Sequence, residues 1–105
     1  MDIGELAGNI GLEEEEFLEL VEIFVEKSKS DISNLQSAFD KGDIEQVVEA
    51  AHSIKGASGN LGFREIFEIA KGIEMYARQN IMEGAPKAVQ FIKEKIDLIG
   101  ARLVK

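Results

Sequence analysis

Apolar residues recur every three or four positions along almost the whole chain, and this periodicity constrains its fold most strongly. Only one proline occurs in 105 residues, and no alternating apolar and polar run is long enough for a strand. The pattern predicts helices at about 2–7, 13–39, 44–60 and 63–79, and a last helix that begins near Gly84-Ala85-Pro86. Short turns between long amphipathic helices make neighbours antiparallel. We therefore expect an all-α fold, an antiparallel up-down four-helix bundle with a short N-terminal cap helix.

The four long helices each carry an apolar face that we expect to point into the bundle. In the first of them, Leu20 and Val25 are expected to widen the buried face, and Gly42 is expected to end the helix in a left-handed conformation. The remaining inward residues are Phe17, Val21, Phe24, Ile32, Leu35 and Phe39, then Ile44, Val47, Val48, Ala51, Ile54, Ser58 and Leu61, then Ile66, Ile69, Ala70, Ile73 and Ala77, and finally Val89, Ile92, Ile96, Ile99 and Leu103.

Composition excludes several kinds of site and partner. The absence of cysteine excludes disulfides, thiolate chemistry and cysteine-ligated zinc, and a single histidine excludes a histidine-cluster metal site. A net charge of −8 disfavours binding to nucleic acid and to anionic membranes. The charge instead indicates a protein partner, or it serves only to keep the protein soluble. No apolar run approaches the roughly 18 residues of a membrane span, and no signal peptide is visible. We expect one cytoplasmic domain over residues 1–105, acting as a monomer.

The single histidine, His52, has an unusual set of neighbours. In a helix, Lys55, Gly56 and Gly59 lie on the same face as His52. Each glycine destabilises a helix interior by up to about 1 kcal/mol relative to alanine, so two of them need a reason. An accessible imidazole with room beside it for a phosphoryl group, and a lysine close by, is such a reason. The alternative is an ordinary surface or half-buried helical histidine.

The turn near residue 63 predicts which residues of the next helix lie level with His52. If the hairpin reverses there, His52 faces Glu74, Lys55 faces Lys71, and Gly59 faces Phe67. One face of the 63–79 helix then carries Phe67, Lys71, Glu74 and Arg78. We expect Lys55, Lys71 and Arg78 to form a basic rim around His52, with Glu74 in reach of the imidazole.

These residue types suit phosphoryl transfer. A free imidazole has a pKa of about 6.5, so one ring nitrogen keeps a lone pair at neutral pH, and a carboxylate bonded to the other nitrogen fixes the tautomer. Neighbouring lysines stabilise phosphoryl oxygens. No Walker A loop or strand-borne nucleotide fingerprint is present. Ser53 and Ser58 are near enough in sequence for a Ser-His-acid triad to be considered, but periodicity directs neither toward His52.

The run Ala51-His52-Ser53-Ile54-Lys55-Gly56-Ala57-Ser58-Gly59-Asn60-Leu61-Gly62 closely resembles the signature of histidine-containing phosphotransfer (HPt) domains. The resemblance implies that His52 is phosphorylated, that Lys55 neighbours the phosphate, and that Gly56 and Gly59 open access to it. It also implies a phosphoryl carrier, not an enzyme, which exchanges the group with receiver aspartates or accepts it from a histidine kinase. The resemblance also implies that such a carrier has no nucleotide site, no metal and no cofactor of its own. The Mg²⁺ needed for transfer comes with the receiver partner.

Position 74 differs between the classes of HPt domain. Many hybrid-kinase HPt domains carry glutamine where this chain has Glu74, and chemotaxis kinases carry glutamate, so the subclass is undecided. The alternative function is a non-transferring adaptor, a pseudo-HPt module that docks a signalling protein through the surface of Phe67 and Gly59. The presence of both His52 and Lys55 favours the carrier.

Overall fold

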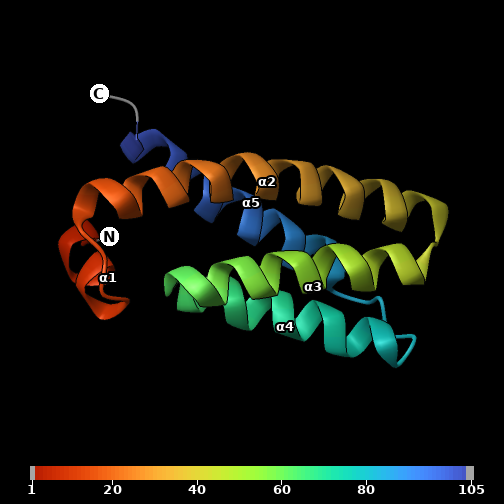
Figure 1. Ribbon diagram of the computed structural model, residues 1–105. Coiled ribbons are helices and arrows are strands. Elements are labelled where there is room, and N and C mark those ends of the chain that lie inside the picture. The colour runs from red at the N-terminus through yellow and green to blue at the C-terminus, as the bar shows by residue number, and fades with distance from the viewer. Residues whose placement is uncertain (1, 104–105) are drawn as a thin grey trace.

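The computed structural model describes residues 2–103, which form five α-helices and no strand. The helices are α1 (Ile3–Asn9), α2 (Glu14–Lys41), α3 (Ile44–Leu61), α4 (Arg64–Arg78) and α5 (Ala85–Leu103). The four long helices form an antiparallel up-down bundle, and α1 lies across one end of it (Figure 1). The predicted all-α fold and the order of its helices are confirmed, with long-helix ends within one or two residues of those expected.

Each long helix packs against two others, so the bundle closes around a single core. Helix α3 contacts α2 and α4, and α5 contacts α2 and α4 on the other side. The 28 residues of α2 give the molecule its length of 41 Å, since an α-helix rises 1.5 Å per residue. The core is aliphatic except near the α3–α4 turn, where the rings of Phe24 and Phe63 pack with centroids 5.2 Å apart.

The turns that join the helices set their register. Gly42 and Gly62 end α2 and α3 with φ of +67° and +84°, in the left-handed region that favours glycine. Asp43 caps the start of α3, where its carboxylate accepts the Gln46 N–H at 3.2 Å. Because α3 ends at Leu61 and α4 begins at Arg64, the α3–α4 hairpin reverses where the sequence predicted.

The buried face of α2 differs from the prediction at one position. Val25 is buried as expected, but Leu20 is 42% exposed, so it does not widen the core. Helical geometry places Leu20 about 100° from Val21, toward solvent, and the second buried row of α2 passes through Ser28 and Asp31 instead. None of the helices within residues 2–103 is both long and apolar enough to cross a membrane.

Candidate functional site

His52 lies on the outer face of α3, with its side chain 63% exposed. Its neighbours Ala51 and Ile54 are fully buried, so packing of α3 into the core fixes the face on which the imidazole stands. One turn further along, a Cβ added at Gly56 would meet nothing within 4 Å. The helix surface beside His52 is therefore open, as the two-glycine pattern predicted for Gly56.

Glu74 of α4 contacts three basic side chains, His52, Lys55 and Arg78. Its side chain is only 7% exposed, and its Oε2 lies 3.1 Å from His52 Nδ1. Lys55 Nζ approaches Oε1 at 2.8 Å, and Arg78 Nη2 donates to Oε2 at 2.7 Å. The contact between His52 and Glu74 that the hairpin register predicted is present, and Lys55 and Arg78 meet the same carboxylate.

The ionisation of Glu74 determines the tautomer of His52. Burial by itself would raise the pKa of this carboxyl, but the hydrogen bonds from Lys55, Arg78 and His52 outweigh burial and lower the pKa from 4.5 to about 2. Glu74 is thus a carboxylate at neutral pH and can only accept hydrogen bonds. Nδ1 of a neutral His52 must then carry the proton, which leaves the lone pair on Nε2.

We expect Glu74 to stabilise the fold in a pH-dependent way. A carboxyl whose pKa falls from 4.5 in the unfolded chain to about 2 in the folded one contributes about 3 kcal/mol above pH 4.5. This contribution is lost as the pH falls from 4.5 toward 2, because the unfolded chain takes up the proton first. Urea unfolding of wild type and Glu74→Gln should show a stability difference at pH 7 that falls to about half or less at pH 3 and largely disappears near pH 2.

Glu68→Gln is the matched control for this experiment. Glu68 lies on the exposed face of the same helix and has no hydrogen bond or ion pair within residues 2–103. The substitution should leave the pH dependence of unfolding close to that of wild type. Equal pH dependence in wild type and Glu74→Gln would contradict the account of Glu74.

Lys71 and Arg78 do not take the positions expected of them in a basic rim around His52. Lys71 is exposed and forms no ion pair with the part of the chain that the structure describes. Arg78 approaches the imidazole from the Nδ1 side, through the Glu74 carboxylate, and so does not stand beside Nε2. Lys55 is also held by Glu74, with its side chain 26% exposed.

Gly59 allows α3 and α4 to pack closely against each other. A Cβ at this position would lie 2.9 Å from Cδ1 of Phe67, closer than real side chains come. The expected alignment of Gly59 with Phe67 is present, and the half-buried Phe67 ring fills the space that the missing side chain leaves. Gly56 is thus the glycine that leaves the face of α3 open, whereas Gly59 accommodates α4.

Sequence reasoning missed a polar cluster on the α2 side of His52. Ser53 donates to Oδ2 of Asp31 at 2.7 Å, and Lys27 Nζ lies 3.2 Å from Oδ1 of the same carboxylate. Asp31 is 4% exposed, so these contacts tie the His52-bearing turn of α3 to α2. The sequence feature that could have revealed this cluster is Asp31 on the inward row of α2, with Lys27 four residues before it.

Neither serine near His52 in sequence forms a triad with it. Ser53 bonds to Asp31, and Ser58 donates to the Ile54 and Lys55 carbonyl oxygens at 2.7 and 3.1 Å. Within residues 2–103, no group of three or more histidine, aspartate or glutamate side chains could hold a metal ion.

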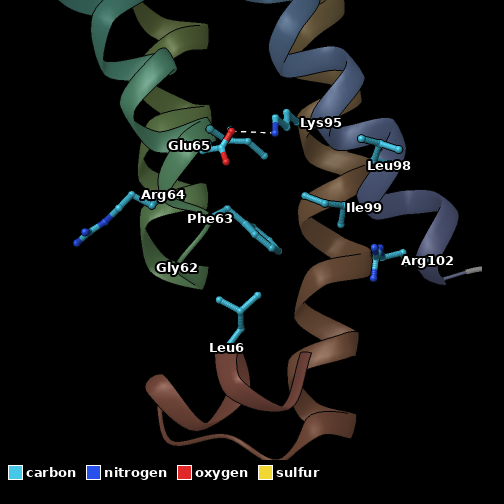
Figure 2. A pocket seen from close by; sticks show the side chains of 10 residues that line it. Leu6, Gly62, Phe63, Arg64, Glu65, Lys95, Leu98, Ile99 and Arg102 are labelled. Atoms are coloured by element: carbon cyan, nitrogen blue, oxygen red, sulfur yellow. Dashed lines mark ion pairs between the residues drawn. The ribbon is translucent and has the colours of Figure 1, made fainter. Parts of the chain in front are cut away.

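A pocket of about 390 Å³ lies at the α3–α4 turn, and none of the residues around His52 lines it. Leu6 of α1 and Phe63 form part of its wall, and Lys95 of α5 pairs with Glu65 of α4 at 2.8 Å (Figure 2). The other lining residues are Gly62, Arg64, Ile66, Leu98, Ile99 and Arg102. This pocket is separate from the histidine site.

Comparisons with known proteins agree with this geometry. The Hpt domain family matches residues 19–102, which is most of the chain. The structure is similar to that of histidine-containing phosphotransfer protein B (HptB) from Pseudomonas aeruginosa PAO1. The sequences are 26% identical, the match covers 93% of this chain and 85% of HptB, and the TM-score is 0.82. No curated protein matches the sequence. The chain belongs to the Hpt domain family, whose members are phosphoryl carriers of two-component signalling.

Proposed function

We propose that Nε2 of His52 accepts a phosphoryl group and exchanges it with the aspartate of a response-regulator receiver domain. The observation that carries the proposal is the exposed imidazole whose Nδ1 faces an ionised, buried carboxylate. This contact directs the lone pair of Nε2 outward, where a partner can reach it. A histidine kinase could charge the same exposed atom.

The transfer moves one phosphoryl group and no proton. The Nε2 lone pair attacks phosphorus as the bond from phosphorus to the aspartate oxygen breaks, and those electrons return to the aspartate carboxylate. The Nδ1 proton stays in place, so the product is a phosphoimidazolium whose positive charge the Glu74 carboxylate stabilises. Lys55, one turn from His52, is the nearest cation on α3 for the phosphoryl oxygens.

Mg²⁺ for this reaction should come from the receiver. The carboxylate nearest His52 is Glu74, and three basic side chains already engage it, so this cluster suits an anion better than a metal ion. In the proposed complex, the receiver contributes its carboxylates and the bound ion, and this chain contributes the nucleophile and cations. We propose that a single bundle carries out this role as a monomer.

Incubation with a receiver domain charged with labelled phosphate tests the proposal. Label should move to the purified chain, in a form that acid removes and alkali does not, as a phosphoramidate behaves. A folded chain that stays unlabelled against several receivers and kinase domains would contradict the proposal. Binding of a receiver without transfer would then support the alternative of a docking adaptor.

We expect Gly56→Leu to slow transfer without unfolding the bundle. A leucine there would stand in open space, four residues after His52 and on the same face, where a docked receiver must approach. Transfer should fall by about tenfold or more, while thermal stability stays equal or rises because leucine favours helix over glycine by about 0.8 kcal/mol. Gly56→Ala, which adds one methyl group, should stay close to wild type. An undiminished rate in Gly56→Leu would refute the role of Gly56 in access.

A further inference from the structure

Arg78 binds the same carboxylate oxygen that faces His52. Its Nη2 and Nε lie 2.7 and 3.3 Å from Oε2 of Glu74, and His52 Nδ1 lies 3.1 Å from that oxygen. Lys55 contacts the other oxygen, Oε1. Oε2 is thus shared between the imidazole and a guanidinium that stays charged at any relevant pH.

Sharing this oxygen with a cation changes what Glu74 does for His52. Arg78 offsets part of the negative charge on Oε2, so the carboxylate stabilises a positively charged imidazole ring less than it would alone. The ring is positively charged when Nε2 carries a phosphoryl group, because the Nδ1 proton remains. Anything that weakens Glu74 as an acceptor therefore makes Nε2 a poorer nucleophile and a better leaving group.

We propose that Arg78 is a positioning residue that acts through Glu74 to limit how strongly His52 holds a phosphoryl group, and so favours release to an aspartate. This inference rests on the proposed function of His52. The step itself is the reverse of phosphoryl acceptance: the bond between Nε2 and phosphorus breaks, its electrons return to Nε2, and the aspartate oxygen bonds to phosphorus.

The proposal separates Arg78 from the other charged groups of the three helices around His52. Glu74 contacts the imidazole and Lys55 contacts Oε1 of Glu74, whereas Glu49 on α3, the Lys27–Asp31 pair on α2 and Lys71 on α4 form no hydrogen bond or ion pair with His52 or Glu74. Arg78 alone among these cations bonds to Oε2, on the side of the ring away from the reacting nitrogen. Its effect on His52 should therefore disappear when Glu74 loses its charge.

Arg78→Gln tests the proposal by two measurements. The side chain is 60% exposed, so the variant should fold. In the unphosphorylated chain, the ¹⁵N resonance of His52 Nδ1 should move downfield as its hydrogen bond to Glu74 strengthens; the single histidine makes assignment unambiguous. With a receiver domain, the phosphoryl equilibrium should move toward phosphohistidine by about threefold, the size of an exposed ion-pair effect.

Two controls decide whether Glu74 transmits the effect. Arg64→Gln makes the same chemical change on the same helix, at an exposed arginine with no ion pair in residues 2–103, and should move neither measurement. In a Glu74→Gln background, adding Arg78→Gln should have no further effect. An unchanged Nδ1 resonance in Arg78→Gln, an equal response in Arg64→Gln, or a full effect without Glu74 would overturn the proposal. The resonance decides this even if no receiver charges His52.

Discussion

Replacing His52 with glutamine should abolish phosphoryl acceptance and leave the bundle folded. Glutamine keeps a similar size and polarity but has no nitrogen with a free lone pair, since its amide nitrogen is not nucleophilic. The chain has no second histidine, so nothing can substitute for His52. The side chain is 63% exposed, and the substitution removes no part of the buried core.

Circular dichroism and a transfer assay together check this expectation. The helical signal should match that of wild type. Labelled phosphate transferred from a charged receiver should stay below about 1% of the wild-type level, because the variant has no nucleophile that could accept the phosphoryl group. Ser53→Ala provides a comparison at the adjacent position, because it removes a hydroxyl that bonds to Asp31 and not to His52. It should leave the nucleophile intact. Label retained by His52→Gln would place the phosphorylated residue elsewhere.

Lys55→Ala should slow transfer by about 10- to 1,000-fold, the range typical of one electrostatic contact to a transferring group. Lys55 follows His52 by one helical turn and is held by Glu74 at 2.8 Å before the reaction. When three phosphoryl oxygens arrive at Nε2, the ammonium group has a stronger anion within reach of its long, flexible side chain. Loss of this cation should raise the barrier in both directions of transfer.

Lys93→Ala is the matched control, because it removes the same charge from the surface of α5. Lys93 pairs with exposed Asp97 at 3.3 Å, outside the cluster around Glu74. Rapid-mixing measurements with a charged receiver should give a wild-type rate for Lys93→Ala and a reduced one for Lys55→Ala. A rate for Lys55→Ala within twofold of wild type would remove Lys55 from the mechanism.

The sequence predicted the bundle because its signals are local and periodic. Gly42 and Gly62 mark the two turns, and the apolar stripes between them give the helix faces. Leu20 shows the limit of this reasoning: periodicity allows a buried face to widen in either direction, and only packing against α3 and α5 selects Ser28 and Asp31 over Leu20. A hydrophobic residue next to a buried stripe need not be buried.

The site was predictable where it followed from the turn and not where it depended on side-chain conformation. The turn at Gly62 sets the register that brings Glu74 to His52. Spacing places Lys71 and Arg78 on one face, but long flexible side chains choose their partners by charge, and Arg78 bonds to buried Glu74 while Lys71 stays in solvent. The contact of Ser53 with Asp31 joins helices whose relative rotation no sequence spacing gives.

Identification of the nitrogen that bonds to phosphorus would test the central claim most directly. The chain, labelled with ¹⁵N and phosphorylated by a charged receiver, should show coupling of phosphorus to Nε2 of His52, with Nδ1 still protonated. This outcome is expected if the Glu74 carboxylate, whose pKa is lowered to about 2, accepts a hydrogen bond from the Nδ1–H of His52. Coupling to Nδ1, or phosphate on a carboxylate with no coupling to nitrogen, would contradict the account of the site.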